Sequence, residues 1–178
     1  MSALADPPVT GLTRQPPAAP SPSALTGDQP EPARSVTIEV PGMPRWNRPW
    51  FVQYIEAELN SLCALQEGWD GHRAKPISDG AIVVTIQVLG ALMDQTSPPP
   101  QLFPLPDGGI QAEWHVAGNK IEIEIDGTGE AYLLADRSDG SVVAEGPATR
   151  EDPDGGVASA REFLRALAAR LARVPAVA

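Results

Sequence analysis

Residues 110–125 constrain the fold more than any other part of the chain. Apolar and polar side chains alternate from Ile110 to Val116 and again from Ile121 to Ile125. Alternation with a period of two is typical of half-buried strands, and two such segments around a glycine-containing turn predict an antiparallel hairpin. Because a register shift of one residue would bury the glutamates of both strands, the pattern also restricts how the strands can pair.

The predicted turn of this hairpin is a two-residue loop at Gly118 and Asn119. Both residue types tolerate the positive φ values that tight hairpins require. This loop sets apolar residues of the two strands opposite one another. The expected pairs are Val116 with Ile121, Trp114 with Ile123, and Ala112 with Ile125.

The rest of the sheet is predicted as an antiparallel meander with one apolar face that needs a cover. Turns at residues 126–129 and 137–140 lead into further strands, and an earlier strand is expected to begin near Leu102. Residues 35–40 favour a short strand or an extended lead-in. After the first of these turns, the expected apolar pairs are Ile123 with Tyr132 and Ile121 with Leu134.

Three helices are predicted, at residues 49–67, 79–95 and 154–174, because apolar residues recur there at helical spacing. Ser78 is a suitable N-cap for the second helix, and Gly68 is expected to end the first. The second helix is apolar around most of its circumference, so it should be central or lie at an interface. The expected fold class is α+β, with helices packed on one face of a meander of four to five strands.

The first 34 residues differ in composition from the rest of the chain. They contain eight prolines and no aromatic residue. Such a segment cannot bury enough apolar surface to offset the entropy lost on ordering, which predicts a disordered, Pro-rich arm. Residues 35–178 are long enough to form a single α+β domain.

Composition restricts the partners and the compartment. The chain carries 23 acidic and 13 basic residues, a formal net charge of −10 at pH 7. Nucleic acid is not an expected partner, because affinity for it depends on lysines and arginines that neutralise phosphates, whereas a basic protein fits the charge. Cys63 is the only cysteine, so no intrachain disulfide can form. The N-terminus lacks a signal-peptide pattern and no apolar run is long enough to span a membrane, so we expect a cytoplasmic protein without membrane contact.

The first candidate site is the segment Gly68-Trp69-Asp70-Gly71-His72. Its glycines allow a sharp turn that holds the indole and the carboxylate in place. In a functional interpretation, Asp70 and His72 form an acid/base pair or a pair of metal ligands. In a structural interpretation, Trp69 fills the core and Asp70 accepts hydrogen bonds from its own loop. Because Asp-Gly turns are common and need no chemistry, the structural interpretation is favoured.

The second candidate site is the polar face of the central hairpin. In the predicted register Glu113 faces Glu124 and His115 faces Glu122, with Gln111 beside them. Facing carboxylates repel one another by up to about 1 kcal/mol. A divalent metal bound by Glu113, Glu124 and His115, or arginines from a partner protein, would compensate for this repulsion. Alternatively, the glutamates splay apart in water, where salt screens the repulsion.

A third candidate, Pro106-Asp107-Gly108-Gly109, leads into the central strand. Two glycines would let a ligand approach the backbone closely. The segment is not a phosphate-binding loop, because it lacks the required lysine and does not open a helix. A structural turn is therefore the favoured interpretation.

Aromatic residues before the first predicted helix suggest an interface. Trp46 and Trp50 lie close in sequence to Arg45 and Arg48. Tryptophan and arginine anchor many protein interfaces, so exposed rings here predict a binding patch, and closure of the core is the alternative. Cys63 falls on the apolar side of the first helix, which favours a role in the core over one as a nucleophile.

Two of these segments resemble motifs in a group of small bacterial proteins that have no assigned activity. The resemblance covers roughly residues 59–132 and implies a bacterial origin and a shared fold. It carries over no activity, and His72-Arg73 departs from the small or aromatic residues expected there. The matching residues are Gly68-Trp69-Asp70-Gly71 with Ala74, Pro76 and Ser78, and then the run from Pro104 to Trp114 that includes Asp107-Gly108-Gly109.

These features lead to three functional hypotheses. No nucleophile, metal-ligand or dinucleotide-binding motif is present in the sequence, and no cofactor or metal is expected. The leading hypothesis is a non-enzymatic, acidic protein-binding module, such as an antitoxin or immunity-like partner of a neighbouring gene product. The alternatives are a small metal-dependent hydrolase that uses the Glu and His side chains of the hairpin, and a structural subunit of a homo-oligomer. The residues proposed to bind a protein are Glu113, His115, Glu122, Glu124, Trp46 and Trp50.

Overall fold

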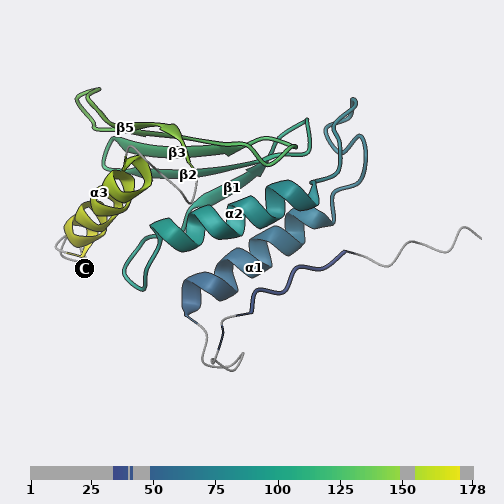
Figure 1. The fold of residues 1–178 in the computed structure, drawn as a ribbon, viewed down its shortest axis with the longest axis horizontal. Helices are drawn as coiled ribbons and strands as arrows, with labels where there is room; N and C mark the ends of the chain where they lie inside the picture. The colour runs from purple at the N-terminus through teal and green to yellow at the C-terminus, as the bar shows by residue number, and fades with distance from the viewer. Residues whose placement is uncertain (1–33, 40, 42–48, 149–154, 173–178) are drawn as a thin grey trace, which may run out of the picture. The chain divides into compact units, whose positions relative to one another are not determined.

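The chain folds into helices on one side and an antiparallel sheet on the other (Figure 1). The computed structural model describes residues 34–39, 41, 49–148 and 155–172, so the predicted arm lies outside the description except for Arg34. The helices are α1 (Trp50–Cys63), α2 (Asp79–Leu92) and α3 (Gly156–Leu171). The strands are β1 (Gln101–Pro104), β2 (Ile110–Val116), β3 (Asn119–Ile125), β4 (Ala131–Asp136) and β5 (Val142–Pro147).

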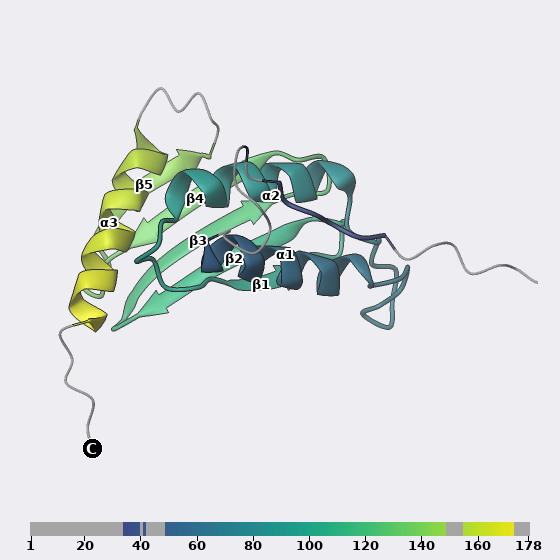
Figure 2. The same cartoon turned by 90° about the horizontal axis from the view of Figure 1, so that it is seen from below.

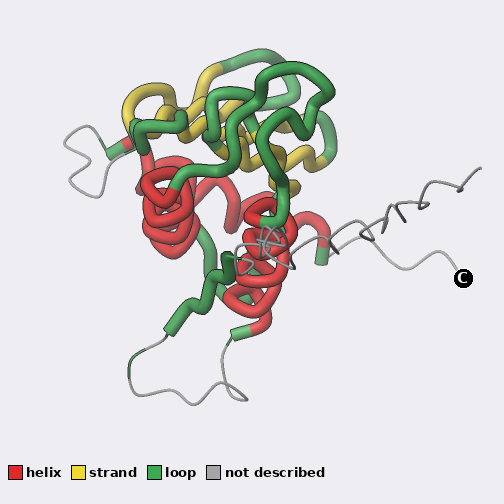
Figure 3. The backbone as a smooth tube through the Cα atoms, turned by 90° about the vertical axis from the view of Figure 1, so that its right-hand side faces the viewer, coloured by secondary structure: helices red, strands yellow, loops and turns green. Residues whose placement is uncertain are grey.

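The sheet is a meander, in which the five strands pair antiparallel in their chain order. The three helices cover one of its faces (Figure 1 and Figure 2). Helix α1 packs against β1, α2 against β2 and β3, and α3 against β5 and β4. In Figure 3 the helices lie on one side of the strands, and no described helix covers the opposite face. The predicted fold class, α+β with helices on one face of a meander, is confirmed.

One hydrophobic core lies between the two layers. It is built from the inward side chains of the strands and the apolar stripes of the helices, as the alternation and helical spacing predicted. The largest fully buried side chains are Trp114, Leu59, Ile77, Leu89, Leu92, Ile110, Ile121, Ile123, Ile125, Leu133, Leu164 and Leu167.

The predicted register of the central hairpin is wrong by two residues. Trp114 faces Ile121 and Ala112 faces Ile123, whereas the predicted partner of Trp114 was Ile123. The loop consists of Ala117 and Gly118, where Gly118 and Asn119 were predicted. Because the error is an even number of residues, each side chain still lies on the predicted face of the sheet, although its cross-strand neighbour differs.

Asn119 explains this register. It is buried and pairs with Val116 as the first residue of β3. Its side-chain amide donates to the Val116 carbonyl at 2.9 Å, and its Oδ1 accepts from the backbone N–H of Ser138 at 3.1 Å. Ala117 and Gly118 form the loop instead, with φ values of 49° and 77°, as a turn with two left-handed residues requires.

The predicted pairing of β3 with β4 is also wrong, here by one residue. Ile123 faces Leu133 and not Tyr132. The turn between these strands closes with a hydrogen bond from the Asp126 N–H to the Glu130 carbonyl at 2.9 Å, which leaves three residues in the loop. An odd shift reverses the faces, so Tyr132 lies on the open side of the sheet, 48% exposed. Leu134, predicted to pair with Ile121, likewise faces Glu122.

The helices begin and end close to their predicted positions. Ser78 accepts a hydrogen bond from the Ala81 N–H at 3.0 Å, which confirms it as the N-cap of α2. Helix α1 ends at Cys63, four residues earlier than predicted, and Gly68 adopts its left-handed conformation (φ 74°) in the turns that follow. Residues 35–39 form no strand. They run extended beside α1, where the Asn60 side chain bonds both the N–H and the carbonyl of Val36.

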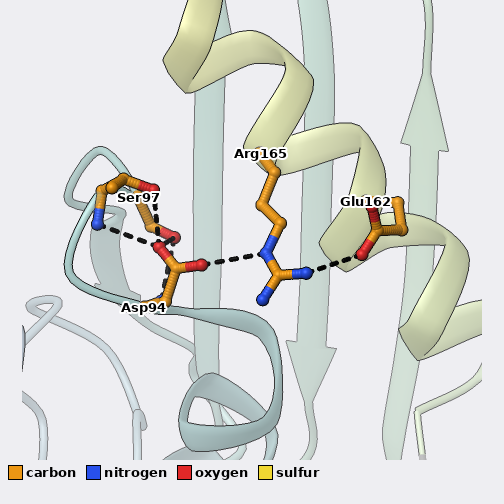
Figure 4. Close-up of polar contacts among 5 residues, drawn as sticks. Asp94, Ser97, Glu162 and Arg165 are labelled. Carbon is orange, nitrogen blue, oxygen red and sulfur yellow. Dashed lines mark hydrogen bonds and ion pairs between the residues drawn. The ribbon is translucent and has the colours of Figure 1, made fainter.

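Asp94 joins the end of α2 to α3 (Figure 4). Its Oδ1 accepts hydrogen bonds from the backbone N–H and the hydroxyl of Thr96, at 2.9 and 2.7 Å, and from the Ser97 hydroxyl at 3.3 Å. Its Oδ2 accepts from Arg165 Nε at 2.9 Å, while Glu162 binds the same guanidinium at 2.7 Å. The hydrogen bonds from Thr96, and then that from Arg165, hold the pKa of Asp94 well below its ordinary range.

This lowered pKa predicts acid sensitivity. Because the folded pKa lies below the unfolded value of about 3.9, Asp94 stabilises the fold above that pH, and the contribution is lost as the pH falls toward the folded pKa. We expect Asp94→Asn to lower the free energy of unfolding at pH 7 by about 1–2 kcal/mol. Urea unfolding of both proteins from neutral pH to about pH 2 should show the difference shrinking below about pH 4. A difference that stays constant with pH would contradict the assignment.

Candidate functional site

The candidate site is the face of the sheet opposite the helices, which we call the open face. It comprises the outward side chains of all five strands. The register places them in rows that run across the sheet, perpendicular to the strands. The central row is Gln101, Glu113, Glu122, Leu134 and Glu145, and its neighbours are Phe103, Gln111, Glu124, Tyr132 and Pro147 on one side and His115, Lys120, Asp136 and Val142 on the other.

The predicted cross-strand pairs on this face need correction. Glu113 faces Glu122 and not Glu124, which lies opposite Gln111, and His115 faces Lys120 and not Glu122. The two-residue shift in the hairpin register is the reason. The residue types on the face were predicted correctly, and two carboxylates do face each other, but they are a different pair.

The facing carboxylates are compensated within the chain. The Gln111 amide donates to Glu113 Oε1 and to Glu122 Oε1, both at 2.8 Å, so it bridges the pair. Lys120 forms an ion pair with the other oxygen of Glu122, and this hydrogen bond raises the pKa of the lysine. His115 Nε2 lies 2.7 Å from Glu113 Oε2. The repulsion that suggested a metal or a partner's arginines is therefore already offset, and the network holds both carboxylates in place.

The open face remains strongly acidic after this compensation. It carries five carboxylates and one lysine. The side chain of Glu124 is exposed and forms no hydrogen bond or ion pair with the described part of the chain. Glu145 accepts a hydrogen bond from the Tyr132 hydroxyl at 3.0 Å, which raises the pKa of Tyr132. A negative field over a sheet surface attracts basic macromolecules.

Exposed apolar groups lie among these charges. Phe103 on β1 is 42% exposed, Tyr132 on β4 is 48% exposed and Val142 on β5 is 53% exposed. Aromatic side chains on a face that is otherwise polar are typical of protein interfaces, where they supply contact area at low entropic cost. The open face thus combines charge with several apolar anchors.

The Trp-Asp-Gly segment forms a structural loop. Asp70 Oδ1 accepts hydrogen bonds from the backbone N–H groups of His72 at 2.8 Å and Ala74 at 3.3 Å. The bond from His72 is the main reason why the pKa of Asp70 is lowered. Gly71 is left-handed (φ 80°), and the His72 side chain is exposed. Asp70 thus accepts hydrogen bonds from its own loop, whereas Trp69 is only half-buried and does not fill the core.

Residues 106–109 contact both the β3–β4 turn and the loop that follows Trp69, and Asp107 provides the contact with the turn. Its Oδ1 accepts from the Gly109 N–H at 3.0 Å, and its Oδ2 accepts from the Gly127 N–H at 2.8 Å. The neighbouring carbonyls of Pro106 and Gly108 accept hydrogen bonds, at 2.9 Å each, from the loop that follows Trp69. The turn was predicted but this contact was not, because a carboxylate that accepts a hydrogen bond from an amide 20 residues away leaves no local sequence pattern.

Trp50, one residue of the predicted tryptophan patch, is not part of the open face. Trp46 lies outside the described residues. Trp50 begins α1 on the helical side and is 39% exposed, with its indole N–H bonded to the Gln95 carbonyl at 3.1 Å. Its ring contacts Phe51 and Tyr54. Cys63 is buried in the core, as predicted, and burial raises the pKa of its thiol.

Three further features of the described residues bear on the hypotheses. Within the described ranges, no three His, Cys, Asp or Glu side chains are grouped so that they could hold a metal ion. Glu113 contacts His115 and Gln111, and the facing Glu122 contacts Gln111 and Lys120, so both carboxylates are already paired within the chain. The apolar circumference of α2, which suggested a homo-oligomer, is largely buried against the sheet and α3.

None of the helices in the described parts is long and apolar enough to cross a membrane.

Comparison of the chain with protein-family models, with curated proteins and with solved structures finds no match. The resemblance to a group of small bacterial proteins therefore stays a prediction.

A cleft that the sequence did not predict lies between α2, the β3–β4 turn and the start of α3. Its volume is about 640 Å³. Its residues come from five separate elements, so no local pattern could have indicated it. They are Val84, Gln87, Val88 and Ala91 of α2, Glu124, Asp126, Gly129 and Glu130 of β3 and its turn, Ala131 and Tyr132 of β4, Pro147 and Ala148 at the end of β5, and Val157 of α3.

Proposed function

We propose that this chain is a non-enzymatic, cytoplasmic binding protein whose open face holds a basic surface of another protein. The observation that carries the proposal is a five-stranded sheet with all described helices on one face and, on the other, five carboxylates, one lysine and several exposed apolar groups. Long-range attraction from such a face speeds encounter with a basic partner, and the apolar groups supply contact area.

The rigidity of the face supports the same proposal. Glu113 and Glu122 are held by the Gln111 amide, by Lys120 and by His115, and their side chains are only 19% and 21% exposed. Charged groups that are already ordered lose little entropy when a partner binds. We extend the proposal to an antitoxin or immunity-like role, in which the chain masks a basic surface of a protein encoded beside it.

Charge reversal on this face tests the proposal. Glu124→Lys with Glu145→Lys replaces two exposed carboxylates outside the Gln111 bridge, so the fold should be retained. Native mass spectrometry of the tagged full chain, purified gently from its host, would first identify a stoichiometric basic polypeptide. We expect the double variant to bind this polypeptide at least about tenfold more weakly, a loss of about 1.4 kcal/mol or more.

A matched control separates the face from the net charge. Glu58→Lys with Glu67→Lys changes the charge equally, but these residues lie in α1 and just after it, on the helical side. The control should bind like the wild type, and the affinity of the wild type should fall as salt rises. Equal weakening in both double variants, or no weakening in either, would contradict the assignment of the open face.

A further inference from the structure

We propose that the cleft between α2, the β3–β4 turn and α3 is a binding site for a small organic cation, a molecule with a hydrocarbon body and an ammonium group. The site goes beyond the proposed protein-binding function. Its volume of about 640 Å³ lies within the range of about 300–1,000 Å³ that is usual for small-molecule sites.

The walls of the cleft favour a hydrocarbon body. Most of the lining surface is apolar, and six of the thirteen lining residues are valines and alanines of α2, β4, the end of β5 and α3. The hollow exists because the residues there are small: Ala131 and Ala148 lie next to each other at the ends of β4 and β5, joined by a hydrogen bond of 2.8 Å. A ligand that covers apolar surface of this kind removes it from water, which stabilises the complex by about 25 cal/mol per Å².

The charges around the cleft favour a cation. Glu124, Asp126 and Glu130 are among the lining residues, and the described lining contains no lysine, arginine or histidine. Asp126 is held in its turn by hydrogen bonds to Oδ1 from the Thr128 hydroxyl at 2.7 Å and from the Glu130 N–H at 3.0 Å. The bond from Thr128 is the main cause of its lowered pKa, so Asp126 is negatively charged at neutral pH. An anionic ligand would meet uncompensated like charge, whereas an ammonium group would be attracted.

The test compares three probes that share one hydrocarbon chain. Hexylammonium, hexanol and hexanoate are titrated into the full chain while amide shifts are followed by NMR. We expect hexylammonium to shift the amides of Val88, Ala131 and Ala148 and to bind at least tenfold more tightly than hexanoate. Equal affinity for the cation and the anion would overturn the proposed ligand class.

Variants establish where the probe binds. Ala91 is an exposed residue of α2 in the lining, so Ala91→Phe should fill the mouth of the cleft and weaken hexylammonium binding at least tenfold. Ala57→Phe makes the same change at an exposed site on α1 and should have no effect. Glu130→Lys should weaken hexylammonium and strengthen hexanoate. Unchanged binding in Ala91→Phe, or amide shifts remote from the cleft, would overturn the proposal.

The proposed protein-binding function can fail without affecting this result. Ala91, Val88 and Ala148 lie outside the open face, so their variants probe the cleft alone. Glu124 lines the cleft as well as the open face, whereas Glu145 lies outside the cleft lining, so Glu145→Lys alone tests the protein surface separately.

Discussion

Gly109→Ala is expected to lower the free energy of unfolding by about 3 kcal/mol. A Cβ atom at this position would lie 2.3 Å from the carbonyl oxygen of Ile125 and 3.0 Å from Asp107 Oδ1. The backbone has little room to move away, because the Gly109 N–H binds Asp107 and its carbonyl accepts from the Leu105 N–H at 3.0 Å. Urea unfolding monitored by circular dichroism would measure the loss.

Gly90→Ala is the matched control for this substitution. Gly90 lies inside α2, and a Cβ atom there would meet no atom within 4 Å. Alanine is favoured over glycine in a helix interior by about 1 kcal/mol, so this variant should be more stable than the wild type. Opposite signs for the two glycines would support the close approach at Gly109. Equal effects would mean that backbone entropy, and not the contact with Ile125, determines the result.

The sequence predicted the fold class because local patterns were enough to identify the strands and helices. Strict alternation in β2 and β3 identified which residues face the core, and Ser78 located the start of α2. The strand register was harder to predict from the sequence. It depends on Asn119, whose buried amide completes the turn and contacts Ser138, and on Ala117, which adopts a left-handed conformation that is unusual for alanine.

In the candidate site, too, the features with a local sequence pattern were predicted and those that depend on the register were not. The outward glutamates of β2 and β3 were predicted correctly, because the error of two residues keeps each side chain on its face. The one-residue error at the next turn moved Tyr132 from the core side to the open face, so an exposed aromatic group was missed. The bridge from Gln111 to Glu113 and Glu122 was also missed, since it depends on which residues face one another.

Trp114→Ala is expected to have the largest effect of any substitution considered, a loss of about 4 kcal/mol in the free energy of unfolding. The indole is 2% exposed at the centre of the inner face of β2, opposite Ile121. Its removal leaves a cavity that the flanking strands cannot close, because their hydrogen bonds hold them apart. It also removes the partner of the Pro98 carbonyl, which accepts from the indole N–H at 2.8 Å.

Two further variants separate the cavity from the hydrogen bond. Trp114→Phe keeps most of the apolar volume but leaves the Pro98 carbonyl unpaired, so we expect a loss of about 1–3 kcal/mol. Trp69→Ala makes the same truncation in a half-buried ring that donates to the Lys75 carbonyl at 3.2 Å, and it should cost less than Trp114→Ala. Thermal and urea unfolding of the three proteins would rank them. If Trp69→Ala were the most damaging, the loop of residues 68–78, and not the hairpin, would be the main source of stability.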